Sequence, residues 1–203
     1  MQTVHVGVYD TLADWETGYA TAHIRRDLWQ QRPGTFRIVT VGRTREPITT
    51  MGGVRIVPDI ALDELDPADS AMLILAGSET WESGELDDFG RKAAEFLAAG
   101  TPVAAICGAT AGMARQGLFD TRPHTSAVLP YLQMQEGYAG GEHYVEADAV
   151  TGGDLISAGP TEPIAFAREI LQRLDVYTPK VLEAWFRLYK QSDATAFEVL
   201  MTA

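Results

Sequence analysis

The sequence is poor in cysteine and has no long apolar run, and each absence excludes a class of protein. One cysteine among 203 residues excludes an internal disulfide framework and any metal site built from several cysteines. No apolar run approaches the roughly 18 to 20 residues that a membrane-spanning helix requires. Because no basic segment followed by an apolar stretch stands at the start, we expect a cytoplasmic rather than a secreted protein.

Basic side chains are also scarce. The chain has 16 Lys and Arg against 28 Asp and Glu, which leaves a net charge of −12. An acidic surface repels phosphate backbones and anionic lipid, so we expect neither a nucleic-acid nor a membrane partner. Closely spaced histidine pairs are absent, and we therefore expect no metal and no other cofactor. A small molecule or a peptide is the expected substrate.

The remaining pattern is that of an α/β protein. Short runs rich in Val and Ile alternate with longer segments of helical period, which indicates parallel β-α-β units. The strands are expected at residues 3–9, 37–42, 71–76 and 102–107. Helices are expected at about residues 15–31 and 85–99, and after Cys107 as far as Gly117.

The rest of the chain is less regular. Residues 50–58 are interpreted as a hairpin or an edge strand, and residues 144–150 and 154–157 as a strand, turn and strand. Residues 129–141 are expected to form a long irregular loop. Two helices, at residues 162–174 and 180–191, are expected to close the chain.

The only thiol stands where an apolar strand ends and a helix of small residues begins. A sharp strand-to-helix turn needs small residues two positions before and two after its central residue, and Ala105 and Ala109 satisfy this spacing around Cys107. Gly108 allows close approach of the backbone. Amides at the helix start favour a thiolate and can bind an oxyanion. The alternative is a buried cysteine without a chemical role.

Two other strand ends supply candidate partners for this cysteine. Glu16 follows the first strand, next to Asp14, whose simplest role is to cap the helix. The amides of Gly77 or Ser78, after the third strand, are candidates for the second half of an oxyanion hole. Ordinary turn residues are the alternative for each of these positions.

The four histidines differ in their surroundings. His5 lies within a strand, and His23 lies two helical turns beyond Glu16, so packing roles are the simplest interpretation of both. His124 and His143 lie in the loops that follow the cysteine helix. Either can face the thiol or the solvent. Trp15, Trp81 and the aromatic residues of 131–144 are candidate pocket walls, with packing as the alternative.

These features together resemble a known family. The residues that carry the resemblance are the cysteine elbow at 104–108, the Trp15-Glu16-Thr17 step, the Ala76-Gly77-Ser78 turn, His124 and the stretch 155–167. They resemble the DJ-1/PfpI superfamily, in its PfpI-like bacterial branch. The resemblance implies a flavodoxin-like, three-layer α/β/α sandwich of the class I glutamine-amidotransferase type. It runs from about residue 3 to 175. We therefore expect a DJ-1/PfpI-like domain at residues 1–175, with residues 176–203 as a helical extension packed on the same domain.

The resemblance also implies roles for individual residues. Cys107 would be the nucleophile, Glu16 the carboxyl group bonded to the sulfur, His124 a general acid/base, and Gly77 and Gly108 the oxyanion donors. A homodimer is implied as well. The segment Gly159-Pro160-Thr161-Glu162-Pro163 lacks the histidine that glutaminases of this fold use, which argues against glutamine hydrolysis. The expected function is a cysteine hydrolase or amidase; the alternatives are an oxidative-stress sensor without turnover and a glyoxalase or deglycase for reactive aldehydes.

Overall fold

The computed structural model describes residues 1–203 and is built on one sheet of seven strands. The order of the strands is β5-β2-β1-β6-β7-β9-β8, and every pair is parallel except β8 with β9. The strands span Gln2–Gly7 (β1), Phe36–Gly42 (β2), Ile60–Ala61 (β5), Met72–Leu75 (β6), Val103–Ile106 (β7), Ala149–Gly152 (β8) and Leu155–Ala158 (β9). This arrangement confirms the expected α/β class with a mostly parallel sheet.

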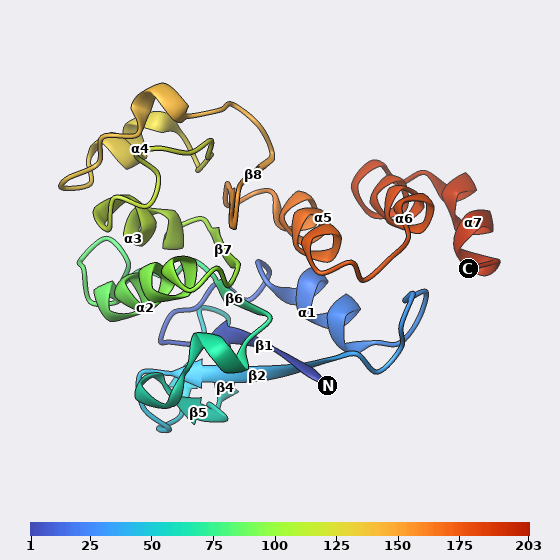
Figure 1. The fold of residues 1–203 in the computed structure, drawn as a ribbon, viewed down its shortest axis with the longest axis horizontal. Helices are drawn as coiled ribbons and strands as arrows, with labels where there is room; N and C mark the ends of the chain where they lie inside the picture. The colour runs from blue at the N-terminus through green and yellow to red at the C-terminus, as the bar shows by residue number, and fades with distance from the viewer.

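Helices cover both faces of the sheet. Figure 1 shows α2 and α3 on one side of the strands, α1 and α5 on the other, and α6 and α7 beyond α5. The helices span Gly18–Arg25 (α1), Asp87–Ala98 (α2), Ala109–Arg115 (α3), Leu129–Gln133 (α4), Pro163–Arg173 (α5), Pro179–Gln191 (α6) and Phe197–Met201 (α7). None of them combines the length and the apolar composition that crossing a membrane requires.

The central strands are apolar along their whole length because helices cover them on both faces. All residues of β6 and β7 are buried. Continuous apolar runs are typical of parallel strands that have no solvent-facing side. These two strands form the middle of a single hydrophobic core that also includes Phe89, Phe96 and Phe166.

The order of the strands determines where a site can form. The chain runs outward from β1 to β2, then crosses back to β6, which pairs with both β1 and β7. In open parallel sheets, ligands bind beyond the carboxyl ends of the strands where the order reverses. The loops after β1, β6 and β7 meet at this point, and they carry Glu16, Gly77 and Cys107.

The first helix is shorter than predicted. A helix was expected at residues 15–31, whereas α1 ends at Arg25. The side-chain amide of Gln30 donates to the carbonyls of His23, Ile24 and Arg26, at 2.8–3.0 Å. It therefore binds carbonyl groups that a continuing helix would have used, and Trp29 takes a left-handed conformation with φ of 65°.

Two further predictions need correction, and a third is confirmed. Residues 144–148 are not a strand, since only Tyr144 makes an isolated bridge, to His124. The expected loop at 129–141 contains α4. The hairpin expected at residues 50–58 is confirmed: β3 (Ile48–Thr49) pairs antiparallel with β4 (Arg55–Ile56) in a two-stranded sheet separate from the main one.

The C-terminal segment packs on the helical layer formed by α1 and α5. Trp185, on α6, donates its indole N–H to Nε2 of His23 on α1, at 3.1 Å. Thr178 caps the start of α6 by accepting from the Val181 amide, at 3.3 Å. At the other end of the helix, Lys190 pairs with Glu162 and with Asp148. Side-chain contacts thus hold both ends of α6.

Candidate active site

Cys107 occupies a strained turn between β7 and α3. Its φ of 57° lies in the left-handed region, which costs a non-glycine residue about 1–2 kcal/mol. The turn is held because the Cys107 amide donates to Ala158 O at 3.0 Å, and the Cys107 carbonyl accepts from the Thr110 amide and hydroxyl. The thiol is half-buried. The elbow expected from the small residues around Cys107 is therefore present as a turn.

Glu16 lies in the turn between β1 and α1 and is completely buried. Its Oε2 accepts the Gly77 amide at 2.6 Å, while Oε1 has no hydrogen-bond partner that meets ordinary geometry. A buried carboxyl oxygen without a full partner is unusual, because burial without hydrogen bonds is unfavourable for a polar group. The Cys107 thiol interacts with the same side chain.

Gly77 lies against both groups, and the close contact with Cys107 requires a glycine at this position. A methyl group added at this position would lie 2.9 Å from the Cys107 sulfur and 3.0 Å from the Gly108 nitrogen. The close approach brings the loop after β6 directly against the elbow. Because the Gly77 amide already donates to Glu16, the nearby amides without an oxygen acceptor are those of Ser78 and Gly108. Both belong to the set considered for an oxyanion hole.

Burial and mutual repulsion govern the ionisation of the pair. Burial raises the pKa of Glu16 to about 7, against the hydrogen bonds from Gly77 and Cys107. Burial, and then the Glu16 charge, raise the pKa of the Cys107 thiol to about 12. The pKa shift of the thiol is thus opposite to the one expected from the helix start alone. Two charges in contact oppose each other, so the pair carries a single negative charge over the range between these values.

His124 lies in a different cluster from the Cys107 and Glu16 pair. It is buried and stacked on Phe119, with ring centroids 4.3 Å apart. Its Nδ1 bonds to Arg122 O at 2.9 Å and its Nε2 to the Tyr138 hydroxyl at 2.8 Å. Both ring nitrogens therefore have partners within the segment that follows α3, and neither is bonded to Cys107.

The other candidate residues have structural contacts. Asp14 does not cap α1; its carboxylate accepts from the Thr50 hydroxyl and the Gly52 amide and so ties the small hairpin to the site. His5 bonds to the Ser70 hydroxyl at 2.8 Å. Trp15 is half-exposed at the edge of the site and donates to Pro160 O at 3.2 Å. His143 is partly exposed beside Glu142.

Two buried aromatic residues, Trp81 and Tyr9, pack beside the site and bond to the residue before Gly77. Trp81 is fully buried, so it is a packing residue rather than a pocket wall, and its indole N–H donates to Ala76 O at 2.8 Å. The Tyr9 hydroxyl bonds to the same carbonyl. Sequence reasoning did not select Tyr9, since a tyrosine at the end of an apolar strand carries no pattern that distinguishes it from core. No group of three or more His, Cys, Asp or Glu side chains is arranged to hold a metal ion.

The doubly wound sheet and the strained cysteine at the carboxyl end of a central strand define a flavodoxin-like protein with a cysteine elbow. Within that class, the chain belongs to the DJ-1/PfpI family, whose sequence model matches residues 2–173. It is 38% identical over 205 residues to the uncharacterized protease YoaZ of Bacillus subtilis, with 99% of this chain and 98% of that protein aligned.

Solved structures agree with this assignment. A thiJ/pfpI family protein from Bacillus anthracis superposes with a TM-score of 0.94 at 39% identity, covering 100% of this chain and 97% of the other. A DJ-1 superfamily protein from Agrobacterium tumefaciens gives 0.85 at 30% identity, covering 95% and 99%. The family match ends before α6, whereas the alignments with YoaZ and the Bacillus anthracis protein extend over the C-terminal helices.

Proposed function

We propose that this protein is a cysteine-dependent hydrolase or amidase acting on a small substrate, with Glu16 as the group that moves protons. The observation that carries the proposal is the buried Glu16 carboxyl group beside the Cys107 thiol, with a pKa raised to about 7. A catalytic acid or base works best when its pKa lies near the working pH. The name of the relative YoaZ, an uncharacterized protease, agrees with the same class of chemistry.

In the proposed reaction, the Glu16 carboxylate takes the thiol proton as the sulfur attacks the carbonyl carbon of an amide or ester. The protonated Glu16 then gives this proton to the leaving amine or alcohol, which departs and leaves a thioester on Cys107. Water attacks the thioester, Glu16 accepts its proton and returns it to the sulfur, and the acid is released. A high thiol pKa suits this sequence, because the proton leaves only as the new bond forms.

The developing oxyanion would bind the amides of Gly108 and Ser78. Neither amide has an oxygen acceptor in the chain, and the two residues are adjacent across the elbow. This assigns to Ser78 the place expected of Gly77, whose amide is bound to Glu16. A pair of fixed amides is the usual means of stabilising such an intermediate. Glu16 also takes the acid/base role expected of His124, whose ring nitrogens both have partners.

A second candidate is isomerisation of a small 2-oxoaldehyde. The observation that favours it is that the ionisable side chain interacting with the thiol is a carboxyl group, Glu16, while both ring nitrogens of His124 have other partners. The sulfur would add to the aldehyde carbon, Glu16 would move a proton from that carbon to the neighbouring one, and water would release a 2-hydroxy acid from the resulting thioester. Atoms and electrons balance without an oxidant. The homodimer and the cytoplasmic location stay predictions.

The two reactions and a sensor role are separated by one set of measurements. Purified protein is given p-nitrophenyl acetate and, separately, methylglyoxal, and nitrophenolate and lactate are measured for the wild type, Cys107→Ser and Glu16→Gln. Exposed Glu142→Gln serves as the matched control. We expect turnover of the ester, lost in Cys107→Ser and reduced about 10²- to 10⁴-fold in Glu16→Gln. Lactate alone would select the isomerase. Fast alkylation with no turnover, and a sulfinic acid after mild peroxide, would select the sensor.

A further inference from the structure

The segment that carries Ser78 is packed tightly against the elbow. A methyl group on Gly108 would lie 3.1 Å from Ser78 O, 3.4 Å from Ser78 N and 3.3 Å from the Trp81 ring. One on Gly112 would overlap that ring. Residues 78–81 therefore pack directly against the elbow and α3, with the Trp81 ring beside Gly108 and Gly112.

Hydrogen bonds fix both the side chain and the backbone carbonyl of Trp81. The indole N–H bonds to Ala76 O at 2.8 Å and to the Tyr9 hydroxyl at 3.2 Å, which fixes the ring. The backbone carbonyl of Trp81 accepts from Nη2 of Arg115 at 2.5 Å. Arg115 is the last residue of α3, the helix that begins immediately after the elbow.

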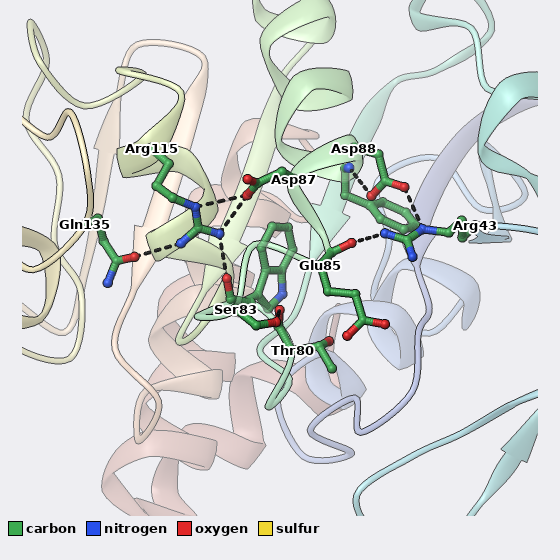
Figure 2. Close-up of polar contacts among 10 residues, drawn as sticks. Arg43, Thr80, Ser83, Glu85, Asp87, Asp88, Arg115 and Gln135 are labelled. Atoms are coloured by element: carbon green, nitrogen blue, oxygen red, sulfur yellow. Dashed lines mark hydrogen bonds and ion pairs between the residues drawn. The ribbon is translucent and has the colours of Figure 1, made fainter.

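Arg115 joins α3 to residues 81–87 and to Gln135, which are distant from one another in sequence. Besides Trp81 O, its guanidinium donates to Asp87 Oδ1 at 2.7 and 3.0 Å and to Gln135 Oε1 at 2.7 Å. Gln135 in turn donates to Tyr131 O in α4, at 3.0 Å. The Arg115 side chain is only 13% exposed. Figure 2 shows Arg115 on one side of the start of α2, contacting Asp87 and Gln135.

A second arginine binds the same helix start without reaching the elbow. Arg43 donates to Asp88 Oδ2 at 2.6 Å and to the Glu85 carbonyl, on the opposite side of the α2 start in Figure 2. It makes no hydrogen bond to Trp81 or Gln135, and its side chain is 47% exposed. The two arginines thus share the start of α2, but only Arg115 contacts the segment that contains Ser78.

We propose that Arg115 is a positioning residue that sets the oxyanion donors by holding Trp81, and with it residues 78–81, against the elbow. This inference rests on the proposed function and deepens it, since it names a side chain that acts without touching the substrate. An arginine is suited to the role because its planar fork makes several hydrogen bonds in fixed directions. Arg115→Lys keeps the charge beside Asp87 and loses that fork.

Two probes of Cys107 separate positioning of the oxyanion donors from reactivity of the sulfur. Acylation by p-nitrophenyl acetate passes through an oxyanion at a carbonyl carbon. Alkylation by iodoacetamide is a displacement at a saturated carbon and develops no such charge. Removing an oxyanion donor slows carbonyl chemistry about 10²- to 10³-fold. A displaced donor should have a smaller effect in the same direction.

The experiment measures both rate constants, at pH 7.5, in the wild type, Arg115→Met, Arg115→Lys and the control Arg43→Met. We expect acylation to fall 10-fold or more in Arg115→Met and several-fold in Arg115→Lys, with alkylation within twofold of wild type. Both rates should stay within twofold in Arg43→Met. If Arg115→Met does not fold, the acylation and alkylation rates of Arg115→Lys decide whether the inference holds. Equal losses in both rates, or no loss in acylation, would overturn the inference.

Failure of the proposed function gives a different result. If wild-type Cys107 is alkylated but not acylated, the hydrolase proposal fails, and the inference that rests on it falls with it. If the wild type is acylated and the Arg115 variants are acylated at the same rate, the function stands and only the role of Arg115 is wrong.

Discussion

Two buried titratable side chains in this molecule, Glu16 and His23, differ in how completely their polar atoms are hydrogen-bonded. His23 is buried with both ring nitrogens bonded, since Nε2 accepts from Trp185 and Nδ1 bonds to the Tyr177 hydroxyl at 2.7 Å. Because Nε2 accepts, the ring proton of the neutral side chain is on Nδ1. Glu16 is equally buried, yet one of its oxygens lacks a proper partner.

The hydrogen bonds of the two side chains distinguish a structural buried group from a reactive one. Burial lowers the pKa of His23 to about 4, so it stays neutral and joins α1 to α6. Burial raises the pKa of Glu16 to about 7, so it can gain or lose a proton near neutral pH beside a thiol. A fully bonded group contributes to stability, whereas an incompletely bonded one next to a nucleophile is typical of a reacting site.

Replacing His23 should destabilise the protein strongly, whereas replacing Glu16 should not. His23→Leu leaves the Trp185 N–H and the Tyr177 hydroxyl buried without partners, and each unpaired group costs about 1–3 kcal/mol. We expect the free energy of unfolding, measured in urea, to fall by about 2–5 kcal/mol while Cys107 alkylation is unchanged. Glu16→Gln at pH 8 should be as stable as wild type or more so. Equal losses of unfolding free energy in His23→Leu and Glu16→Gln would contradict the distinction between a structural His23 and a reactive Glu16.

The pH dependence of stability should have opposite signs at the two positions. Between about pH 4 and 6.5 an unfolded His23 binds a proton that the native side chain does not, so this group makes stability rise with pH. Between about pH 4.5 and 7 native Glu16 keeps a proton that the unfolded chain releases, so this group makes stability fall with pH.

Each of these slopes is at most about 1.4 kcal/mol per pH unit, and in the wild type they oppose each other. Urea unfolding from pH 4.5 to 6.5 should therefore give a steeper rise in Glu16→Gln than in wild type, and a fall or a weaker rise in His23→Gln. Burial also lowers the pKa of His5 and His124, which adds a rise common to both variants. Parallel curves for the two variants would contradict the assignment.

The smallest expected effect concerns the strain at the elbow. At a φ of 57°, alanine is strained and glycine is not, so Cys107→Gly should be more stable than Cys107→Ala by about 1 kcal/mol. Chemical denaturation of both variants measures the difference. Equal stability, or a more stable alanine variant, would mean that the left-handed turn is not strained.

Much of the fold could be predicted because local pattern and tertiary structure agree there. The apolar runs of β6 and β7 and the stop of α2 at Gly100 and Pro102 follow from residue type alone. The early end of α1 could not be predicted in this way. It depends on the Gln30 side chain, whose contacts exist only once the chain has turned.

The site could be predicted in part for the same reason. Glu16, Gly77 and Cys107 stand at strand ends, and the topology brings strand ends together. His124 follows α3 in sequence, but its position could not be predicted. Its stacking on Phe119 and its hydrogen bond to Tyr138 depend on how residues 119–144 pack, and this segment has no periodic pattern. The occupation of the Gly77 amide by Glu16 likewise appears only in three dimensions.

The central claim is that ionisation of Glu16 controls the reactivity of Cys107. The most direct test is the rate of Cys107 acylation by p-nitrophenyl acetate from pH 5 to 10, in the wild type and Glu16→Gln. We expect the wild-type rate to rise with an apparent pKa of about 7 and reach a plateau. In Glu16→Gln this step should vanish, and the rate should rise only above the usual thiol pKa of about 8.5, because burial still raises the pKa of the Cys107 thiol. A wild-type profile with a single rise near pH 8.5, unchanged in Glu16→Gln, would contradict the account.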